Sequence, residues 1–344
     1  MNGKRFFIGA LAASALLLAA SAGLVAWANP LLTAGALEPG ETALFVNERY
    51  ELAGLIRRQE YSNLVMGTSL AANFRASWFT ELLGADTLKV SFPDGRLSEF
   101  DMALDLAFRT HGSIDRVYFD LDPNILVRND QSVELPEYLY NDSPLDDFQF
   151  YLNGESLALA VKSLLLGEEG KRTLDEAYVW DNTHIFSRAA ALAAYSRPEP
   201  VSAPLPADAY LAAAKANVDV VCGWAERYPD TRFIIWFPPY SVLFWDQAAR
   251  QGRTEALLNA IEYAWGRLLA QDNVLVISFL NVQSIITQLN NYTDYIHYSA
   301  RVTEWMAGKL AAEQWRIWPE LYRGQIDELR EFVTGYDYEA IFAS

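Results

Sequence analysis

The chain has 344 residues, of which 51% are hydrophobic and 13% aromatic, and it carries a formal net charge of −17 with a pI near 4.6. This length suits one large α/β domain with additions or two ordinary domains, and the composition excludes a disordered chain. The acidic balance excludes a sequence-independent nucleic-acid binder, which needs a basic face, so we expect no nucleic-acid partner. A single cysteine, Cys222, excludes an intrachain disulfide and a cysteine-based metal site, and we expect neither a metal nor another cofactor.

The N-terminus carries an uncharged apolar run over residues 6–28, preceded by Lys4 and Arg5. The run is long enough to cross a bilayer as a helix, and the positive pair predicts that the rest of the chain lies outside the cytoplasm. A cleaved signal peptide is the alternative, because Ala26-Trp27-Ala28 has the small-x-small form of a cleavage site. The run is longer than a usual signal-peptide core, so we favour a single-pass anchor over residues 1–28.

After the anchor, residues 29–60 are expected to form a juxtamembrane stalk, interrupted by Pro30, Pro39 and Gly40. Apolar strands then alternate with amphipathic helices, which predicts a mostly parallel sheet with helices on both faces. The predicted strands are 64–66, 88–92, 114–121, 233–237 and 274–279. The predicted helices are 70–83, 97–109, 207–227, 241–270 and 299–314. We therefore expect an α/β domain over 61–315 and a C-terminal helical tail over 316–344.

The section over 128–205 is less regular and is interpreted as an insertion that shapes a site, not as a separate domain. It contains an acidic, aromatic loop over 134–150 and a predicted helix over 155–166. The apolar face of that helix carries Leu157, Val161 and Leu164. The loop offers aromatic rings that stack on sugars, and a buried aromatic cluster is the alternative interpretation.

Residues 62–73 predict a buried strand that stops at Gly67 and Thr68, presents Ser69 and turns directly into a helix. The hydroxyl of such a serine is exposed at the carboxyl end of a strand, where ligands bind in parallel sheets. Its own N–H lies near the positive end of the next helix, where a developing oxyanion can be stabilised. Serine is also a favoured helix N-cap, so this residue alone decides nothing.

A second stretch, at residues 294–298, offers a base and an orienting acid. A serine nucleophile needs an imidazole to accept its proton and a carboxylate to fix the imidazole tautomer. Asp294 and His297 lie three residues apart, so they can face the same point. The alternative is that Asp294 caps the following helix and His297 is a partly buried loop residue. Because Ser69 is present, we assign Ser69 as nucleophile, His297 as base and Asp294 as the orienting acid.

Two other histidines receive different interpretations. Asp181 and His184 have the same spacing as the first pair, but they lie in the irregular insertion. Asp181 is expected to cap a following apolar helix, which makes this pair a structural or substrate-contact site. His111 lies in a helix-to-strand turn and is expected at the surface, and Cys222 lies on the apolar stripe of helix 207–227.

With these residues the chain resembles the SGNH, or GDSL-like, hydrolase superfamily. Gly67-Thr68-Ser69 stands in place of the family's Gly-Asp-Ser, and Asp294-x-x-His297 matches its final block. The order of these blocks and the alternation over 61–315 agree with the flavodoxin-like, three-layer fold of that family. The N-terminal anchor makes the chain similar to the membrane-anchored members of bacterial envelopes, such as the D-alanine transfer protein and the alginate acetyltransferases.

The resemblance implies an exported, serine-dependent esterase or O-acyltransferase that works through an acyl-Ser69 intermediate. The implied partners are a cell-envelope polysaccharide or other acylated polymer and a membrane-embedded acyl donor. The implied location is the bacterial cytoplasmic membrane, with the C-terminal domain in the periplasm or at the cell surface. Transferase and hydrolase are not distinguished by these residues.

The resemblance also implies two further oxyanion donors. The family's second block supplies a glycine N–H, for which Gly95 is the candidate. Its third block supplies an asparagine, but Asp122 stands at that position and Asn124 follows two residues later. Asn73, one helical turn after Ser69, is another candidate for the missing amide. An ionised Asp122 would oppose an oxyanion, so either Asp122 is not the third donor, or it is protonated there, or the chain does not carry out ordinary ester hydrolysis. A non-catalytic SGNH-like binding or scaffold protein is therefore the alternative.

A weaker alternative comes from residues 117–122, which have the hydrophobic-strand–Asp-x-Asp form of haloacid dehalogenase-like phosphotransferases. In that family Asp120 would be the nucleophile and Asp122 the acid/base beside Mg²⁺. Here Pro123-Asn124 follows where the motif has Gly-Thr, and a whole βαβ unit precedes it. An EF-hand is excluded because Ile125 stands where its loop needs glycine.

Overall fold

The computed structural model describes residues 3–29, 32, 35–38, 40–143, 146 and 148–343. Pro30 and Pro39 of the expected stalk lie outside these residues, as do positions 144, 145 and 147 of the expected aromatic loop. The chain divides into two compact units. The first unit comprises Met1–Glu60, Met102–His111 and Glu134–Tyr178. The second unit comprises Tyr61–Asp101, Gly112–Val133 and Val179–Ser344.

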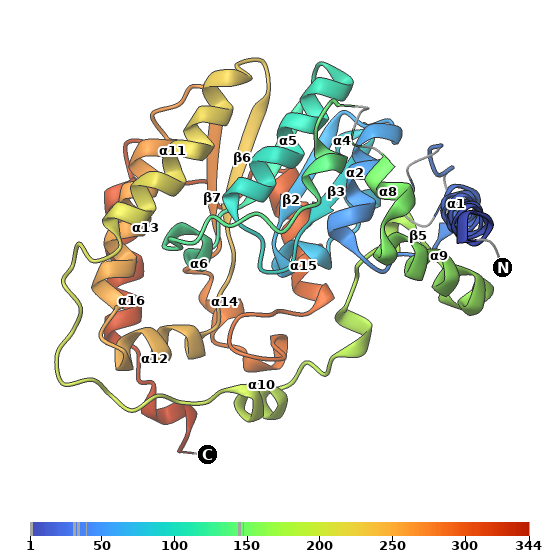
Figure 1. The fold of residues 1–344 in the computed structure, drawn as a ribbon. Helices are drawn as coiled ribbons and strands as arrows, with labels where there is room; N and C mark the ends of the chain where they lie inside the picture. The colour runs from blue at the N-terminus through green and yellow to red at the C-terminus, as the bar shows by residue number, and fades with distance from the viewer. Residues whose placement is uncertain are drawn as a thin grey trace. The chain divides into compact units, whose positions relative to one another are not determined.

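The second unit is built on a five-stranded sheet in the order β3-β2-β4-β6-β7 (Figure 1). Its strands are β2 (Asn63–Gly67), β3 (Thr87–Ser91), β4 (Arg116–Asp120), β6 (Arg232–Phe237) and β7 (Val274–Ser278). Every neighbouring pair in this sheet is parallel. Each strand is an almost continuous buried run, as expected when helices cover both faces. The expected α/β fold with a parallel sheet is confirmed.

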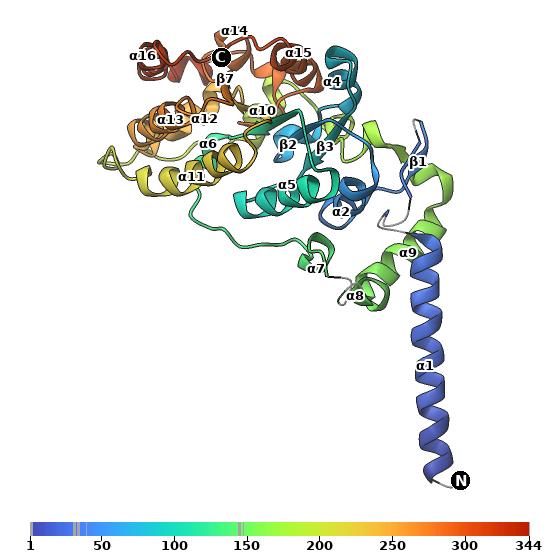
Figure 2. The same cartoon turned by 90° about the horizontal axis from the view of Figure 1, so that it is seen from above.

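Helices of the second unit cover both faces of this sheet. Figure 2 shows α4 and α15 together on one side and α11 on the other. The longer helices are α4 (Ala76–Leu83), α11 (Leu211–Arg227), α12 (Val242–Arg250), α13 (Thr254–Leu268), α15 (Ala300–Ala311) and α16 (Tyr322–Gly335). The shorter ones are α3 (Ser69–Ala72), α6 (Pro123–Leu126), α10 (Arg188–Ala194) and α14 (Gln283–Ile286). The helix α5 (Leu97–His111) begins in this unit and ends in the first.

Two helices expected to be continuous are broken. The helix expected over 70–83 is two helices, α3 and α4, because Asn73 ends α3 and its side-chain oxygen binds N–H groups of a distant segment. The helix expected over 241–270 is α12 followed by α13. Gly252 separates them with φ +64°, a left-handed conformation that glycine adopts without strain, and a Cβ there would lie 2.7 Å from the Cα of Pro204. Cys222 is buried on α11, as expected.

The first unit contains the N-terminal helix α1 (Gly3–Ala28), which is long and apolar enough to cross a membrane; signal sequences share this property. Its other helices are α2 (Glu48–Arg58), α7 (Glu137–Tyr140), α8 (Phe148–Leu152) and α9 (Gly154–Leu166). The short strands β1 (Thr42–Ala43) and β5 (Arg172–Thr173) pair antiparallel. In the expected aromatic loop, Tyr140 and Phe150 are buried, whereas Phe148 is exposed.

Candidate active site

Ser69 is the first residue of α3, directly after the carboxyl end of β2. Thr68 precedes it as the N-cap in extended conformation, and its Oγ1 accepts from the N–H of Leu70 at 3.5 Å. Gly67 is required at the end of β2, because a Cβ there would lie 2.5 Å from the Cβ of Asp120 and 2.8 Å from the Cβ of Ala71. The Gly-Thr-Ser sequence therefore turns the chain in a space too small for a side chain at its first position.

The structure brings Ser69, His297 and Asp294 together, as the sequence predicts. The Ser69 Oγ lies 2.8 Å from His297 Nε2, and His297 Nδ1 lies 2.6 Å from Asp294 Oδ2. The other carboxylate oxygen of Asp294 accepts from the N–H groups of Ile296 and His297, both at 2.8 Å. These two bonds fix the loop, so the imidazole is held between the acid and the serine hydroxyl.

The charge of Asp294 is stabilised in place. Its partial burial would raise its pKa, but the hydrogen bonds from the His297 side chain and from the two N–H groups outweigh burial, so the pKa lies below its usual value. An ionised Asp294 accepts a hydrogen bond from the N–H at Nδ1, which leaves Nε2 with its lone pair directed to Ser69. This is the tautomer that accepts a proton from a serine nucleophile.

Trp180 contacts both Ser69 and His297, and no sequence motif predicts this residue at the site. Its indole Nε1 donates to the carbonyl oxygen of Ser69 at 3.0 Å, and its ring meets that of His297 edge to face at 5.3 Å. Asn73 Oδ1 in turn accepts from the N–H groups of Trp180 and Asp181. Asn73 therefore positions the segment that carries Trp180 through its Oδ1, and its role as an oxyanion donor stays a prediction.

On the other side of Ser69, Asp122 is almost fully buried and caps α6. Its Oδ1 accepts from the N–H groups of Asn124 at 2.7 Å and Ile125 at 3.1 Å and from the Tyr240 hydroxyl at 2.8 Å. Burial raises its pKa, and these hydrogen bonds offset part of the rise. Through its Oδ1, Asp122 is thus a hydrogen-bond acceptor that holds α6.

Asp120 is fully buried below Thr68, whose hydroxyl donates to Asp120 Oδ2 at 3.1 Å. Burial and the neighbouring Asp122 carboxylate raise the pKa of Asp120 well above its usual range. A nucleophile must reach its substrate, and a side chain with no exposed surface cannot. The complete burial of Asp120 therefore disfavours the haloacid dehalogenase-like alternative.

A cavity of about 180 Å³ opens beside the Ser69 hydroxyl. Its lining includes Ser69, His297, Ile296, Tyr240, Asn124 and Arg128. The Nδ2 of Asn124 donates to the Tyr240 hydroxyl at 3.1 Å. Arg128 binds the carbonyl oxygen of Asp94 at 2.9 Å and also pairs with its carboxylate.

Gly95, the other expected donor, lies outside the residues that line this cavity. Its N–H donates to the carbonyl oxygen of Phe92 at 2.8 Å and closes a turn. A Cβ at Gly95 would lie 2.7 Å from the ring of Phe100, so packing requires glycine here. The structure therefore gives this glycine a local structural role.

Around the remaining histidines, the cap expected at Asp181 and the surface position expected for His111 differ from the structure. His184 is exposed and its ring meets Trp180 edge to face at 5.1 Å, so it lies next to the site without joining the triad. Asp181 begins a 3-10 turn and caps no apolar helix; Ser187 instead caps α10 through the N–H of Ala190. His111, expected at the surface, is half-buried and its Nε2 lies 2.8 Å from the carbonyl oxygen of Ile56.

No family model and no curated protein matches this chain. Among solved structures the chain is similar to one described as "The structure of a putative platelet activating factor from Streptococcus pneumonia", with 14% sequence identity and a TM-score of 0.40. The match covers 77% of this chain and 89% of that chain. This distant likeness adds nothing to the assignment of the site, which rests on geometry.

Proposed function

We propose that the chain is a serine-dependent, SGNH-like esterase or O-acyltransferase in which Ser69 carries the acyl group. The observation that supports this most is the continuous chain of contacts from Ser69 Oγ through His297 to Asp294, with separations of 2.8 and 2.6 Å. These distances are within the range for a nucleophile and its base. The position of Ser69 at the carboxyl end of a central parallel strand adds support.

In the first step, Ser69 Oγ attacks the carbonyl carbon of an ester and His297 Nε2 takes the hydroxyl proton. The ester C–O bond breaks, and His297 returns that proton to the departing alkoxide. In the second step, water or a sugar hydroxyl attacks the acyl-Ser69 carbon, and His297 takes its proton and gives it to Ser69 Oγ. Asp294 stays ionised throughout and stabilises the imidazolium.

The oxyanion of each tetrahedral intermediate needs hydrogen-bond donors, and two are available at this cavity. One is the N–H of Ser69, which at the start of α3 has no acceptor within the helix. The other is the Asn124 side chain, since its Nδ2 carries two hydrogens and the Tyr240 hydroxyl uses one of them. Asn124 then supplies the amide that the family's third block provides, in place of Asp122.

The substrate class follows from the cavity and from α1. A cavity of about 180 Å³ favours a short acyl group over a long chain. With α1 inserted as a single-pass anchor, the chain remains at a bacterial cytoplasmic membrane with its catalytic unit outside the cytoplasm. We propose that it adds or removes short acyl groups on a cell-envelope polymer, with a membrane-embedded donor as its partner if it is a transferase.

The test is pre-steady-state hydrolysis of p-nitrophenyl acetate by the full chain. The account predicts a burst of p-nitrophenol equal to the concentration of protein, which Ser69→Ala and His297→Ala both abolish. His184→Ala is the matched control, because His184 has the same spacing from an aspartate and contacts Trp180 but not Ser69. A folded wild type without a burst would contradict the proposal.

A second candidate, a non-catalytic envelope-binding protein, is favoured by one observation. Of the donors expected from the family, Gly95 gives its N–H to Phe92 and Asp122 acts as an acceptor. The same burst experiment separates the two candidates, because a binding protein retains the contact between Ser69 and His297 without forming an acyl-enzyme.

A further inference from the structure

The helix α9 has small residues on its buried side and large apolar residues on its exposed side. Helices of water-soluble proteins usually show the opposite arrangement. The inward side of α9 consists of small residues, since Ser156 and Ala160 are fully buried and Ser163 is half-buried. Its large apolar residues Val161, Leu164, Leu165 and Leu166 are exposed, with Leu165 exposed by 81%. Small residues at the contact and large apolar residues outside are typical of helices surrounded by lipid.

The neighbouring helix α8 extends the same apolar surface. Phe148 and Leu152 of α8 are exposed by 58% and 47%, and α8 contacts α9. We call these six residues the apolar face: Phe148, Leu152, Val161, Leu164, Leu165 and Leu166. Between Phe148 and Leu166 the sequence contains only two charged residues, Glu155 and Lys162. Exposed large apolar residues on two neighbouring helices indicate an interaction surface.

The position of α8 and α9 along α1 identifies what covers this face. Residues 3–20 of α1 are exposed, and the residues that lose exposure fall within 21–28, on the last turns of the helix. Both α8 and α9 contact α1, and Figure 2 shows them beside the end that is remote from the N-terminus. At about 1.5 Å per residue, the uncharged run over 6–28 is roughly 35 Å long and residues 21–28 occupy about 12 Å of it.

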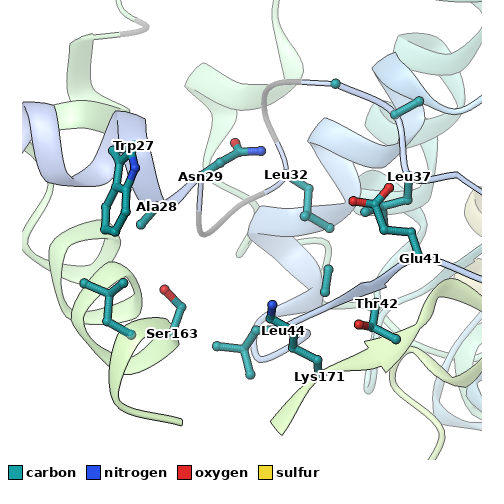
Figure 3. Close-up of a pocket in the computed structure, with 14 residues that line it drawn as sticks. Trp27, Ala28, Asn29, Leu32, Leu37, Glu41, Thr42, Leu44, Ser163 and Lys171 are labelled. Carbon is teal, nitrogen blue, oxygen red and sulfur yellow. The ribbon is translucent and has the colours of Figure 1, made fainter. Parts of the chain in front are cut away.

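A cavity of about 440 Å³ also places α9 beside the last turn of α1 (Figure 3). Trp27 at the end of α1 and Ser163 and Leu164 of α9 border it together, and Lys171 lines the same cavity. Tryptophan is enriched where a membrane-spanning helix reaches the headgroups. The end of α1 and the leucines of α9 therefore lie at the same depth, close to the boundary between lipid and water.

We propose that the apolar face is a second membrane contact, in which α8 and α9 lie in the interface of the leaflet where α1 ends. This inference rests on the insertion of α1 as an anchor. The leucines and Phe148 then enter the acyl-chain boundary, and the long stem of Lys162 lets its ammonium reach the headgroups. The lipid bilayer is the occupant because α1 places the face beside lipid without any other component.

The test uses the full chain in vesicles of phosphatidylethanolamine and phosphatidylglycerol, with the fluorophore NBD on single cysteines in a Cys222→Ala background. Leu165→Cys and Leu152→Cys report the apolar face, and Leu17→Cys reports α1. Leu82→Cys on α4 is the matched control, because Leu82 is an exposed leucine (56%) on a helix of the second unit. Quenching by lipids with a spin label high on the acyl chain is compared with quenching by aqueous iodide.

The inference predicts that NBD at Leu165 and Leu152 is quenched by the spin-labelled lipid and is at least about threefold less quenched by iodide than NBD at Leu82, because the acyl-chain region excludes hydrated anions. Iodide quenching equal to that at Leu82 would overturn it. Protection from both quenchers would also overturn it, since that result indicates a protein partner or a second copy.

If the spin-labelled lipid does not quench NBD at Leu17 in the same vesicles, α1 is not inserted. That result would contradict both the anchor and this inference. The acyl-transfer proposal is separable, because labelling of Ser69 by a fluorophosphonate is measured on the same samples. Labelling that persists while Leu165 stays exposed to iodide would overturn the membrane contact alone.

Discussion

Two aspartates on opposite sides of Ser69 share one local structure and differ in every other respect. Asp294 accepts from the N–H groups two and three residues later, and so does Asp122. Asp294 also contacts the His297 ring, whereas Asp122 also accepts from the buried Tyr240 hydroxyl and, at 3.5 Å, from the Thr68 hydroxyl. Burial raises the pKa of Asp122, while hydrogen bonds outweigh burial and lower that of Asp294. The local turn is therefore common to both, and the distant partner decides the role.

The largest expected effect is on the rate of acyl-enzyme formation, which should respond differently to substitution of Asp294 and of Asp122. Asp294→Asn should lower the rate of acyl-enzyme formation by about 10²–10⁴-fold, because a neutral amide no longer fixes the tautomer of His297. Asp122→Asn should change that rate much less, since an asparagine oxygen still accepts from the N–H groups that cap α6. Burst kinetics on the two variants measure this difference. Equal losses would show that Asp122 takes part in the chemistry.

The next effect concerns the close packing on the Asp122 side. Gly67→Ala should lower the free energy of unfolding by about 1–3 kcal/mol, because the new methyl group meets Asp120 and Ala71 at distances that force the chain to shift. Urea unfolding measures the loss. Gly308→Ala is the control, since no atom beyond its chain neighbours and the backbone of its own helix lies within 4 Å of its Cβ position. A stable Gly67→Ala variant would contradict the close approach.

A smaller effect is expected on the His297 side from Trp180→Phe. The phenylalanine ring still meets His297, but the donor to the Ser69 carbonyl is lost. One neutral hydrogen bond contributes about 1 kcal/mol, so the burst rate should fall roughly fivefold. Trp180→Ala removes the ring contact as well and should lower the rate further. If both variants keep the wild-type rate, Trp180 has no positioning role.

The smallest effect is on the pH dependence of stability, and its sign differs between the two aspartates. The lowered pKa of Asp294 adds stability above the unfolded pKa of about 3.9, and this stability is lost as the pH falls through the folded value. The raised pKa of Asp122 acts in reverse, because its contribution is complete below about pH 3.9 and declines as the pH rises through the folded value.

Urea unfolding across a pH series measures these slopes. The difference in unfolding free energy between wild type and Asp294→Asn should shrink on acidification. The difference between wild type and Asp122→Asn should shrink as the pH rises from about 4. Slopes of the same sign for both variants would contradict the comparison.

The sequence predicted the parts of the molecule that depend on short-range patterns. The apolar runs located all five strands of the sheet, and the spacing of Asp294 and His297 singled out the loop that lies against Ser69. The breaks at Asn73 and Gly252 were missed, because each depends on a segment distant in the chain.

Contacts around Ser69 that the sequence did not predict have the same cause. Asp122 was placed by its position after a strand, but its hydrogen-bond partner Tyr240 lies more than a hundred residues away. Trp180 had no sequence signal for the same reason, since its contacts with Ser69 and His297 join distant parts of the chain. Neither partner is visible in a local pattern.

The central claim is that Ser69 is an activated nucleophile. The most direct measurement is to treat the folded full chain with a fluorophosphonate and to locate the adduct by peptide mass spectrometry. The account predicts one adduct, on Ser69, formed in wild type, slowed in Asp294→Asn and absent in His297→Ala. An adduct on another residue, or none on a folded wild type, would contradict the account.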